Sequence, residues 1–135
     1  MSISRWCRGV LVAVLAVTTG CGASGGRSEG ASAAATGFTD ALRQGDGRQA
    51  CALLAPRTLE ELEKSEQTSC DEAVTQEQVP AGDVVREVDV YGDQARVVLG
   101  DDTLFLAHFS SGWKVTAAGC VPRPEQPYDC QVKGG

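Results

Sequence analysis

The chain has 135 residues, with 18 acidic and 12 basic side chains and a formal net charge of −6 at pH 7. This length is enough for one domain with a modest hydrophobic core. An acidic surface repels phosphate backbones and anionic lipid headgroups. The charge therefore argues against a nucleic-acid-binding protein and against a protein that basic patches hold on a membrane.

The first 20 residues predict a signal peptide. Arg5 and Arg8 precede an apolar run over residues 9–17, and small residues follow up to Cys21. A positively charged start, a short apolar segment and small residues near the cleavage site are the three parts of an export signal. The apolar run is too short to span a membrane as a mature helix.

The end of this segment resembles the lipobox of bacterial lipoproteins. Gly20 directly precedes Cys21, as in the lipobox, while Thr18 stands where the lipobox usually carries Leu. The resemblance implies cleavage before Cys21 and a diacylglyceryl group on its sulfur, with fatty acyl chains such as palmitate. Each buried methylene contributes about 0.8 kcal/mol, so two or three chains hold a protein stably on a membrane. Two alternatives stay open: ordinary secretion with cleavage after the Ala-x-Ala pattern at 31–33, and an uncleaved anchor.

The number of cysteines also favours export. Cys7 leaves with the leader and Cys21 takes the lipid, so four of the six cysteines remain. Four cysteines in an exported domain predict two disulfides, and the sequence alone leaves three pairings open. We favour the two pairs that each close a short loop between neighbouring elements. These pairs are Cys51 with Cys70, and Cys120 with Cys130.

We expect three segments after the leader. Residues 21–33 are the lipidated cysteine followed by Gly, Ala and Ser with one Arg and one Glu, and they predict a flexible tether. Residues 34–120 form the folded domain, and residues 121–135 form a Pro-rich tail tied back by a disulfide. Without the leader, 10 basic and 18 acidic residues give a net charge of −8. The lipid is therefore the expected membrane contact.

The first half of the domain predicts helices. Apolar residues recur at helical spacing from Ala34 to Leu42, and Gly45 is placed to end that helix. Three capping patterns follow, each an oxygen acceptor with Glu or Gln three residues later, and each predicts the start of a short helix. The acceptors are Asp46, Thr58 and Ser69.

After residue 82 the apolar period changes to two, which predicts an antiparallel meander. Four strands are expected, at residues 84–91, 94–99, 103–109 and 113–118. Alternation places Phe105, Phe109 and Trp113 on the face that meets the helices. Leu104 and Leu106 have the opposite parity, so we expect the tail or a partner to cover them.

Residues 33–120 resemble the cystatin-like cone of the nuclear-transport-factor-two-like superfamily. This α+β fold packs N-terminal helices on a curved four-stranded antiparallel meander sheet. Residues 38–56 and 112–120 are also similar to sequence segments of small actinobacterial lipoproteins of this type. A composition without Asn and with one Ile fits a high-GC genome. In that group these segments build the fold and do not form a functional site. The resemblance therefore implies a fold and a cell-envelope location, and it supplies no catalytic residue.

The candidate chemistry is sparse. His108 and Tyr91 have the parity opposite to the predicted inner face, and Asp101 and Asp102 fit a hairpin turn better than a calcium site. One histidine and no C-x-x-C motif argue against zinc, so we expect no metal or cofactor. Trp113 fits a core aromatic at the start of an inner strand better than a ligand-binding residue. If the fold has a ligand pocket, we expect Trp113, Phe105 and Phe109 to line it.

We therefore expect a non-catalytic, lipid-anchored interaction domain on the extracytoplasmic face of the cell membrane, with an envelope protein as its partner. The alternative is a carrier that holds a small apolar ligand inside the cone. An enzyme of the same fold is the third interpretation. An interior filled by apolar side chains would favour the interaction domain. An open cavity lined by Trp113 and Phe105 would favour the carrier, and a pair of ionisable side chains converging in that cavity would favour the enzyme.

Overall fold

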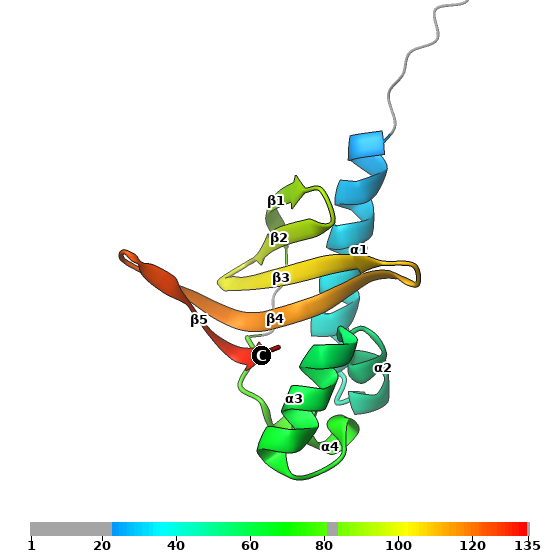
Figure 1. Cartoon of the computed structure of the whole chain (residues 1–135), viewed down its shortest axis with the longest axis vertical. Coiled ribbons are helices and arrows are strands. Elements are labelled where there is room, and N and C mark those ends of the chain that lie inside the picture. The colour runs from blue at the N-terminus through cyan, green and yellow to red at the C-terminus, as the bar shows by residue number, and fades with distance from the viewer. Residues whose placement is uncertain (1–22, 81–83, 135) are drawn as a thin grey trace, which may run out of the picture.

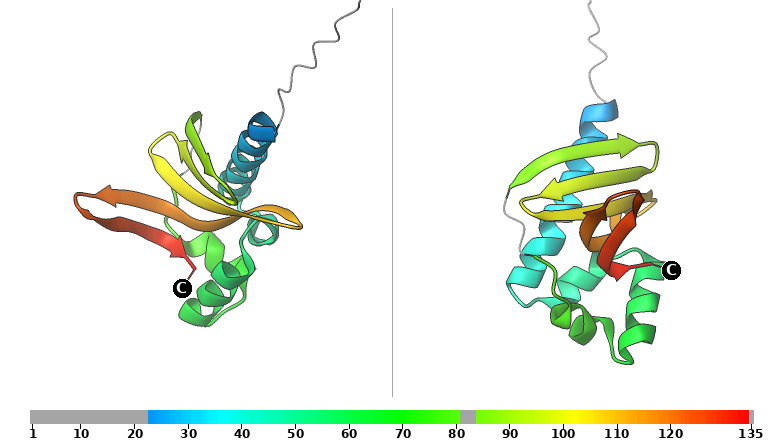
Figure 2. Two further views of the ribbon diagram at one scale, coloured as in Figure 1. Left: turned by 45° about the horizontal axis from the view of Figure 1, so that its top comes forward. Right: turned by 90° about the vertical axis from the view of Figure 1, so that its left-hand side faces the viewer.

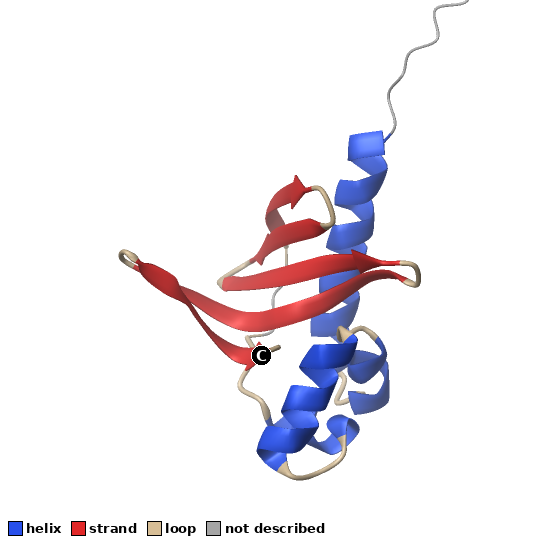
Figure 3. Ribbon diagram, in the orientation of Figure 1, coloured by secondary structure: helices blue, strands red, loops and turns tan. Residues whose placement is uncertain are grey.

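The computed structural model describes residues 23–80 and 84–134. Within these residues, four helices precede a five-stranded antiparallel sheet (Figures 1 and 3). The helices are α1 (Ala23–Arg43), α2 (Gly47–Ala52), α3 (Pro56–Glu66) and α4 (Cys70–Gln76). The strands are β1 (Val85–Tyr91), β2 (Gln94–Leu99), β3 (Asp102–Phe109), β4 (Gly112–Arg123) and β5 (Gln126–Lys133). Their order in the sheet is β1-β2-β3-β4-β5, which is a simple meander.

The α+β class and the order of helices before sheet are confirmed, but the expected number of four strands is wrong. β4 continues to Arg123, and the segment over residues 121–135, expected to be a Pro-rich tail, supplies the end of β4 and all of β5. Cys120 and Cys130 pair directly across these two strands. Pro127 lies in β5 at the edge of the sheet, where a missing N–H donor is tolerated, so the prolines do not prevent a strand.

Helix α1 begins at Ala23, well before the expected start at Ala34. Most of the expected flexible tether, from residue 23 to residue 33, is therefore helical. Ala31 and Ala35 are fully buried, so this part of the helix packs against the rest of the domain. A helix that packs closely on the rest of the domain needs small side chains. This need explains why residues 23–33 are rich in Gly, Ala and Ser, a composition that is also typical of linkers.

The short helices follow the capping signals only in part. Asp46 caps α2 as predicted, because its side chain accepts a hydrogen bond from the backbone N–H of Gln49 at 3.1 Å. α3 instead begins at Pro56, whose fixed φ suits the first helical position. Thr58 lies inside α3, and its hydroxyl donates to the Thr116 carbonyl at 3.1 Å. α4 begins directly after Ser69, although the Ser69 side chain makes no capping bond.

The predicted faces of β3 are reversed. Leu104 and Leu106 are fully buried in the core, whereas Phe105 is only partly buried. The inward-facing residues of β2 explain this, since Ala95 pairs with Leu106 and Val97 with Leu104. Both parities of β3 are apolar, so the sequence pattern alone did not decide between them. The prediction that the tail covers the two leucines is therefore wrong.

The elements divide the molecule into two ends. α1 lies across one face of the sheet, and α2, α3 and α4 gather near the C-terminal end of α1 (Figures 1 and 2). The N-terminus of α1 lies at the opposite end of the molecule, as all views show. The core lies between α1, the small helices and the inward face of the sheet. Its largest fully buried apolar side chains are Phe38, Leu99, Leu104, Leu106, Val74, Val97, Val115 and Val132.

Candidate functional site

The structure does not bring the three predicted pocket residues together. Trp113 is only 7% exposed and belongs to the core that includes α1. Phe105 and Phe109 alternate with the buried leucines of β3 and therefore lie on the other face of the sheet, here called the outer face. The sheet thus separates Trp113 from the two phenylalanines.

Trp113 is enclosed by α1 and by its own sheet. A Cβ placed on Gly30 would lie 2.9 Å from the indole ring, so only glycine allows α1 to pass this close. The Arg27 guanidinium lies 5.6 Å from the centre of the same ring, within cation–π range. The His108 ring contacts it edge-on at 5.0 Å. Trp113 therefore holds the first turns of α1 on the sheet instead of lining a cavity.

The outer face carries the exposed aromatic side chains of the sheet. The rings of Phe105 and Tyr128 pack edge to face, with centroids 5.0 Å apart, so the Tyr128 ring of β5 covers part of the Phe105 ring of β3. Phe109 is 37% exposed at the end of β3. It borders an open pocket of about 360 Å³ at the start of α3, here called the outer pocket. Its lining is mainly apolar and includes Ala55, Pro56, Phe109 and Ala117, with Arg57, Thr58, Thr116 and Gly134.

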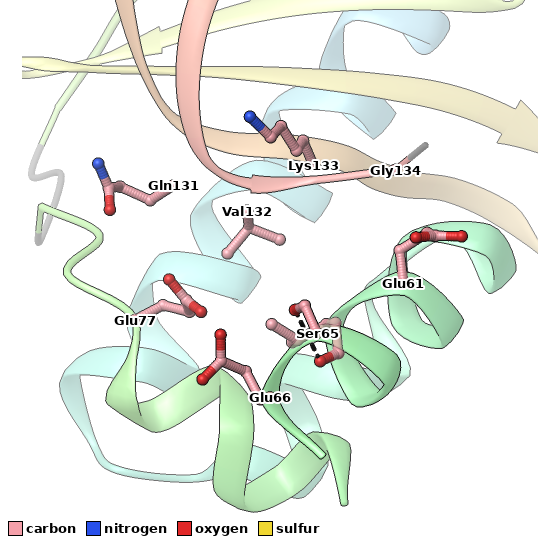
Figure 4. A pocket seen from close by; sticks show the side chains of 9 residues that line it. Glu61, Ser65, Glu66, Glu77, Gln131, Val132, Lys133 and Gly134 are labelled. Carbon is pink, nitrogen blue, oxygen red and sulfur yellow. Dashed lines mark hydrogen bonds between the residues drawn. The ribbon is translucent and has the colours of Figure 1, made fainter. Parts of the chain in front are cut away.

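A second pocket, of about 320 Å³, lies between α3 and β5 and is here called the acidic pocket (Figure 4). The carboxylates of Glu66 and Glu77 point toward one another across it, while Lys133 points away. Partial burial and, secondly, the charge of Glu66 raise the pKa of Glu77 above its usual value. This arrangement suits binding of a cationic group better than of an anion.

Asp102 is the buried charged residue that the sequence analysis missed. Its side chain is 1% exposed, and neither carboxylate oxygen has a hydrogen-bond partner. Burial raises the pKa of Asp102 to about 6, and the backbone N–H groups of Thr103, Cys120 and Gly119, close by but outside hydrogen-bond geometry, offset only part of this rise. The sequence does contain a signal for this burial. Asp102 lies two residues before Leu104, so alternation along β3 places both side chains on the same face of the sheet.

Two disulfides are present, and they join the pairs that the short-loop argument favoured. Cys51 is bonded to Cys70, and Cys120 to Cys130. The first joins α2 to α4, and the second joins β4 to β5. No group of three His, Cys, Asp or Glu side chains suited to a metal ion occurs in the part of the chain that the structure describes.

The predicted leader and the lipidation residue Cys21 lie outside the described residues. Among the helices that the structure describes, none combines the length and the apolar character needed to cross a bilayer. No protein-family model, no curated protein and no solved structure matches this chain.

Proposed function

We propose that this protein is a lipid-anchored, non-catalytic interaction domain on the extracytoplasmic face of the cell membrane. The observation that supports this choice is the position of the aromatic residues. Trp113 is packed beneath α1, whereas Phe105 and Phe109 lie outside, on a face with partly exposed apolar side chains. An interaction domain uses its outer surface, and a carrier needs space inside the fold.

The outer pocket and the adjoining outer face are the surface that we assign to an envelope protein. Aromatic side chains are enriched at the centres of protein interfaces, since they bury a large apolar area with few rotatable bonds. Phe109 supplies such a side chain beside the apolar Pro56 and Ala117. A small apolar ligand in the same open pocket is the second candidate, and its volume of about 360 Å³ is in the range of small-molecule sites.

The anchor is tested by replacing the lipidated residue. The Cys21→Ser variant should be missing from the membrane fraction and should not incorporate labelled palmitate, while the domain remains folded. Cys7→Ser is the matched control, because Cys7 lies in the predicted leader and its loss should leave the mature protein unchanged. A Cys21→Ser variant that is still membrane-bound and acylated would show that the assignment of Cys21 is wrong.

The interaction surface is tested by photo-crosslinking in intact cells. A photoreactive amino acid at Phe109 should give an adduct of one discrete mass, and the same group at the exposed Gln44 should not. Phe109→Ser should remove the interaction without unfolding the domain, since this side chain is partly exposed. If Phe109 and Gln44 give the same adducts, the outer face is not the interaction surface. A ligand-dependent increase in melting temperature without any adduct would favour the carrier.

A further inference from the structure

We infer that the domain is held on the membrane in one orientation. In this orientation the first turns of α1 and the β1–β2 turn meet the lipid headgroups, and α3 and α4 face away from the bilayer. The inference rests on the acylation of Cys21 proposed above. It identifies a lipid-facing surface and, at the other end of the molecule, a surface that is free for a partner.

The length of chain between the lipid and the fold leads to this inference. Only Gly22 separates Cys21 from Ala23, the first residue of α1. Two residue steps span at most about 7 Å, so the start of α1 lies close to the headgroups once Cys21 is acylated. A flexible tether of a dozen residues would allow any orientation, but the residues expected to form that tether are part of the helix.

The start of α1 is also fixed to the sheet, so the sheet cannot turn relative to the helix. One turn into the helix, Arg27 donates to the Gly92 carbonyl at 2.5 Å and to the Asp93 carboxylate at 2.6 Å. Both acceptors belong to the β1–β2 turn, and the Arg27 guanidinium also lies over the Trp113 ring. Four residues of helix rise by about 6 Å, so these contacts place the β1–β2 turn near the same level as the membrane-proximal end of α1.

The charge distribution agrees with this orientation. Between Pro56 and Glu77 the chain has seven acidic and two basic residues, and this part forms α3 and α4. These helices lie at the end of the molecule opposite the N-terminus of α1 (Figures 1 and 2). Anionic headgroups repel acidic surfaces within about a Debye length. The first turns of α1 and the β1–β2 turn have a smaller acidic excess, with Glu29 and Asp93 against Arg27, which pairs with Asp93. Tyr91, 70% exposed beside this turn, suits the polar–apolar boundary of a membrane.

The orientation determines which surface is available to a partner. The 21 residues of α1 span about 31 Å, so α3 and α4 lie roughly that far from the bilayer when the helix is upright. The outer pocket at the start of α3, which we assign above to an envelope partner, then lies toward the end of the molecule that is free of lipid.

The experiment measures the distance of two sites from the lipid in the acylated, full-length mature protein. Gln94→Cys beside the β1–β2 turn and Glu60→Cys on α3 are each labelled with the same small fluorophore, and both original side chains are exposed. The proteins are reconstituted into phosphatidylcholine and phosphatidylglycerol vesicles that contain a nitroxide-labelled lipid, which quenches only at short range. We expect loss of fluorescence at position 94 and none at position 60. A long Gly-Ser linker inserted after Gly22 should remove this difference, because a flexible chain permits all orientations.

Two outcomes would overturn the inference, and they differ from each other. Equal quenching at the two positions in acylated, vesicle-bound protein would refute the fixed orientation and leave the lipid anchor intact. Protein that is not acylated and does not bind vesicles would refute both the anchor and the orientation. Circular dichroism of both labelled variants, matched to the unlabelled protein, shows that the comparison concerns folded domains.

Discussion

Replacing Asp102 with Asn tests the buried carboxylate directly. The ordinary Asp pKa is 3.8, and burial raises it to about 6 in the folded protein. Between these two values the folded state holds a proton that the unfolded state has released, so the free energy of unfolding falls as pH rises through this window. At about 1.36 kcal/mol for each pH unit, Asp102 lowers the stability above pH 6 by about 3 kcal/mol relative to its protonated form.

Asn has nearly the same shape as a protonated Asp and carries no charge, so it avoids this loss. We expect Asp102→Asn to be about 3 kcal/mol more stable than the wild type above pH 7, with the advantage disappearing toward pH 4. Urea denaturation at a series of pH values, followed by Trp113 fluorescence, measures the difference. The exposed neighbour Asp101→Asn is the control and should follow the wild type. A stability difference that does not change with pH would refute the assignment of a buried, ionised Asp102.

Four further variants test the packing of the fold. In α1, Gly30→Ala should lower the stability by about 1–3 kcal/mol because the new Cβ would lie 2.9 Å from an indole ring. Gly26→Ala, where the space is open, should raise it by about 0.5–1 kcal/mol, and denaturant unfolding that shows equal effects would contradict the packing of α1. Cys51→Ser combined with Cys70→Ser should cost about 3 kcal/mol in thermal unfolding, and a neutral effect would mean that this bridge constrains little. Leu104→Ala should cost about 2–5 kcal/mol by urea denaturation, whereas a loss below 1 kcal/mol would restore the original assignment of the β3 faces.

Local sequence signals predicted the order of the elements well. The change of apolar period near residue 82 separated helices from strands, and Asp46 marked the start of α2. These signals depend on the chain near each position, so a single sequence contains them. The prediction that Thr58 caps a helix is wrong, because its hydroxyl donates a hydrogen bond to the Thr116 carbonyl. A local pattern gives no information about a partner so far along the chain.

The wrong predictions for the β3 faces and for the tether share a physical cause. In both segments the local sequence fits two structures equally well, and tertiary contacts decide between them. β3 is apolar on both parities, and the register with β2 selected Leu104 and Leu106. The Gly- and Ala-rich residues 23–33 suit a linker or a closely packed helix. Packing of this segment against the indole of Trp113 favours the helix. The buried position of Asp102 follows directly from the corrected faces of β3. The two candidate pockets combine distant segments, so no local motif could have indicated them.

The edge position of β5 has a consequence for the lipid anchor that we propose. Anchored domains diffuse in two dimensions and meet one another often, and an open strand edge can template pairing between neighbouring molecules. Pro127 interrupts the row of N–H donors along β5, and Asp129 and Lys133 add charges to the same strand. Proline and charge on edge strands discourage such pairing. The composition that suggested a loose tail is thus also a protection against edge-to-edge association of neighbouring molecules.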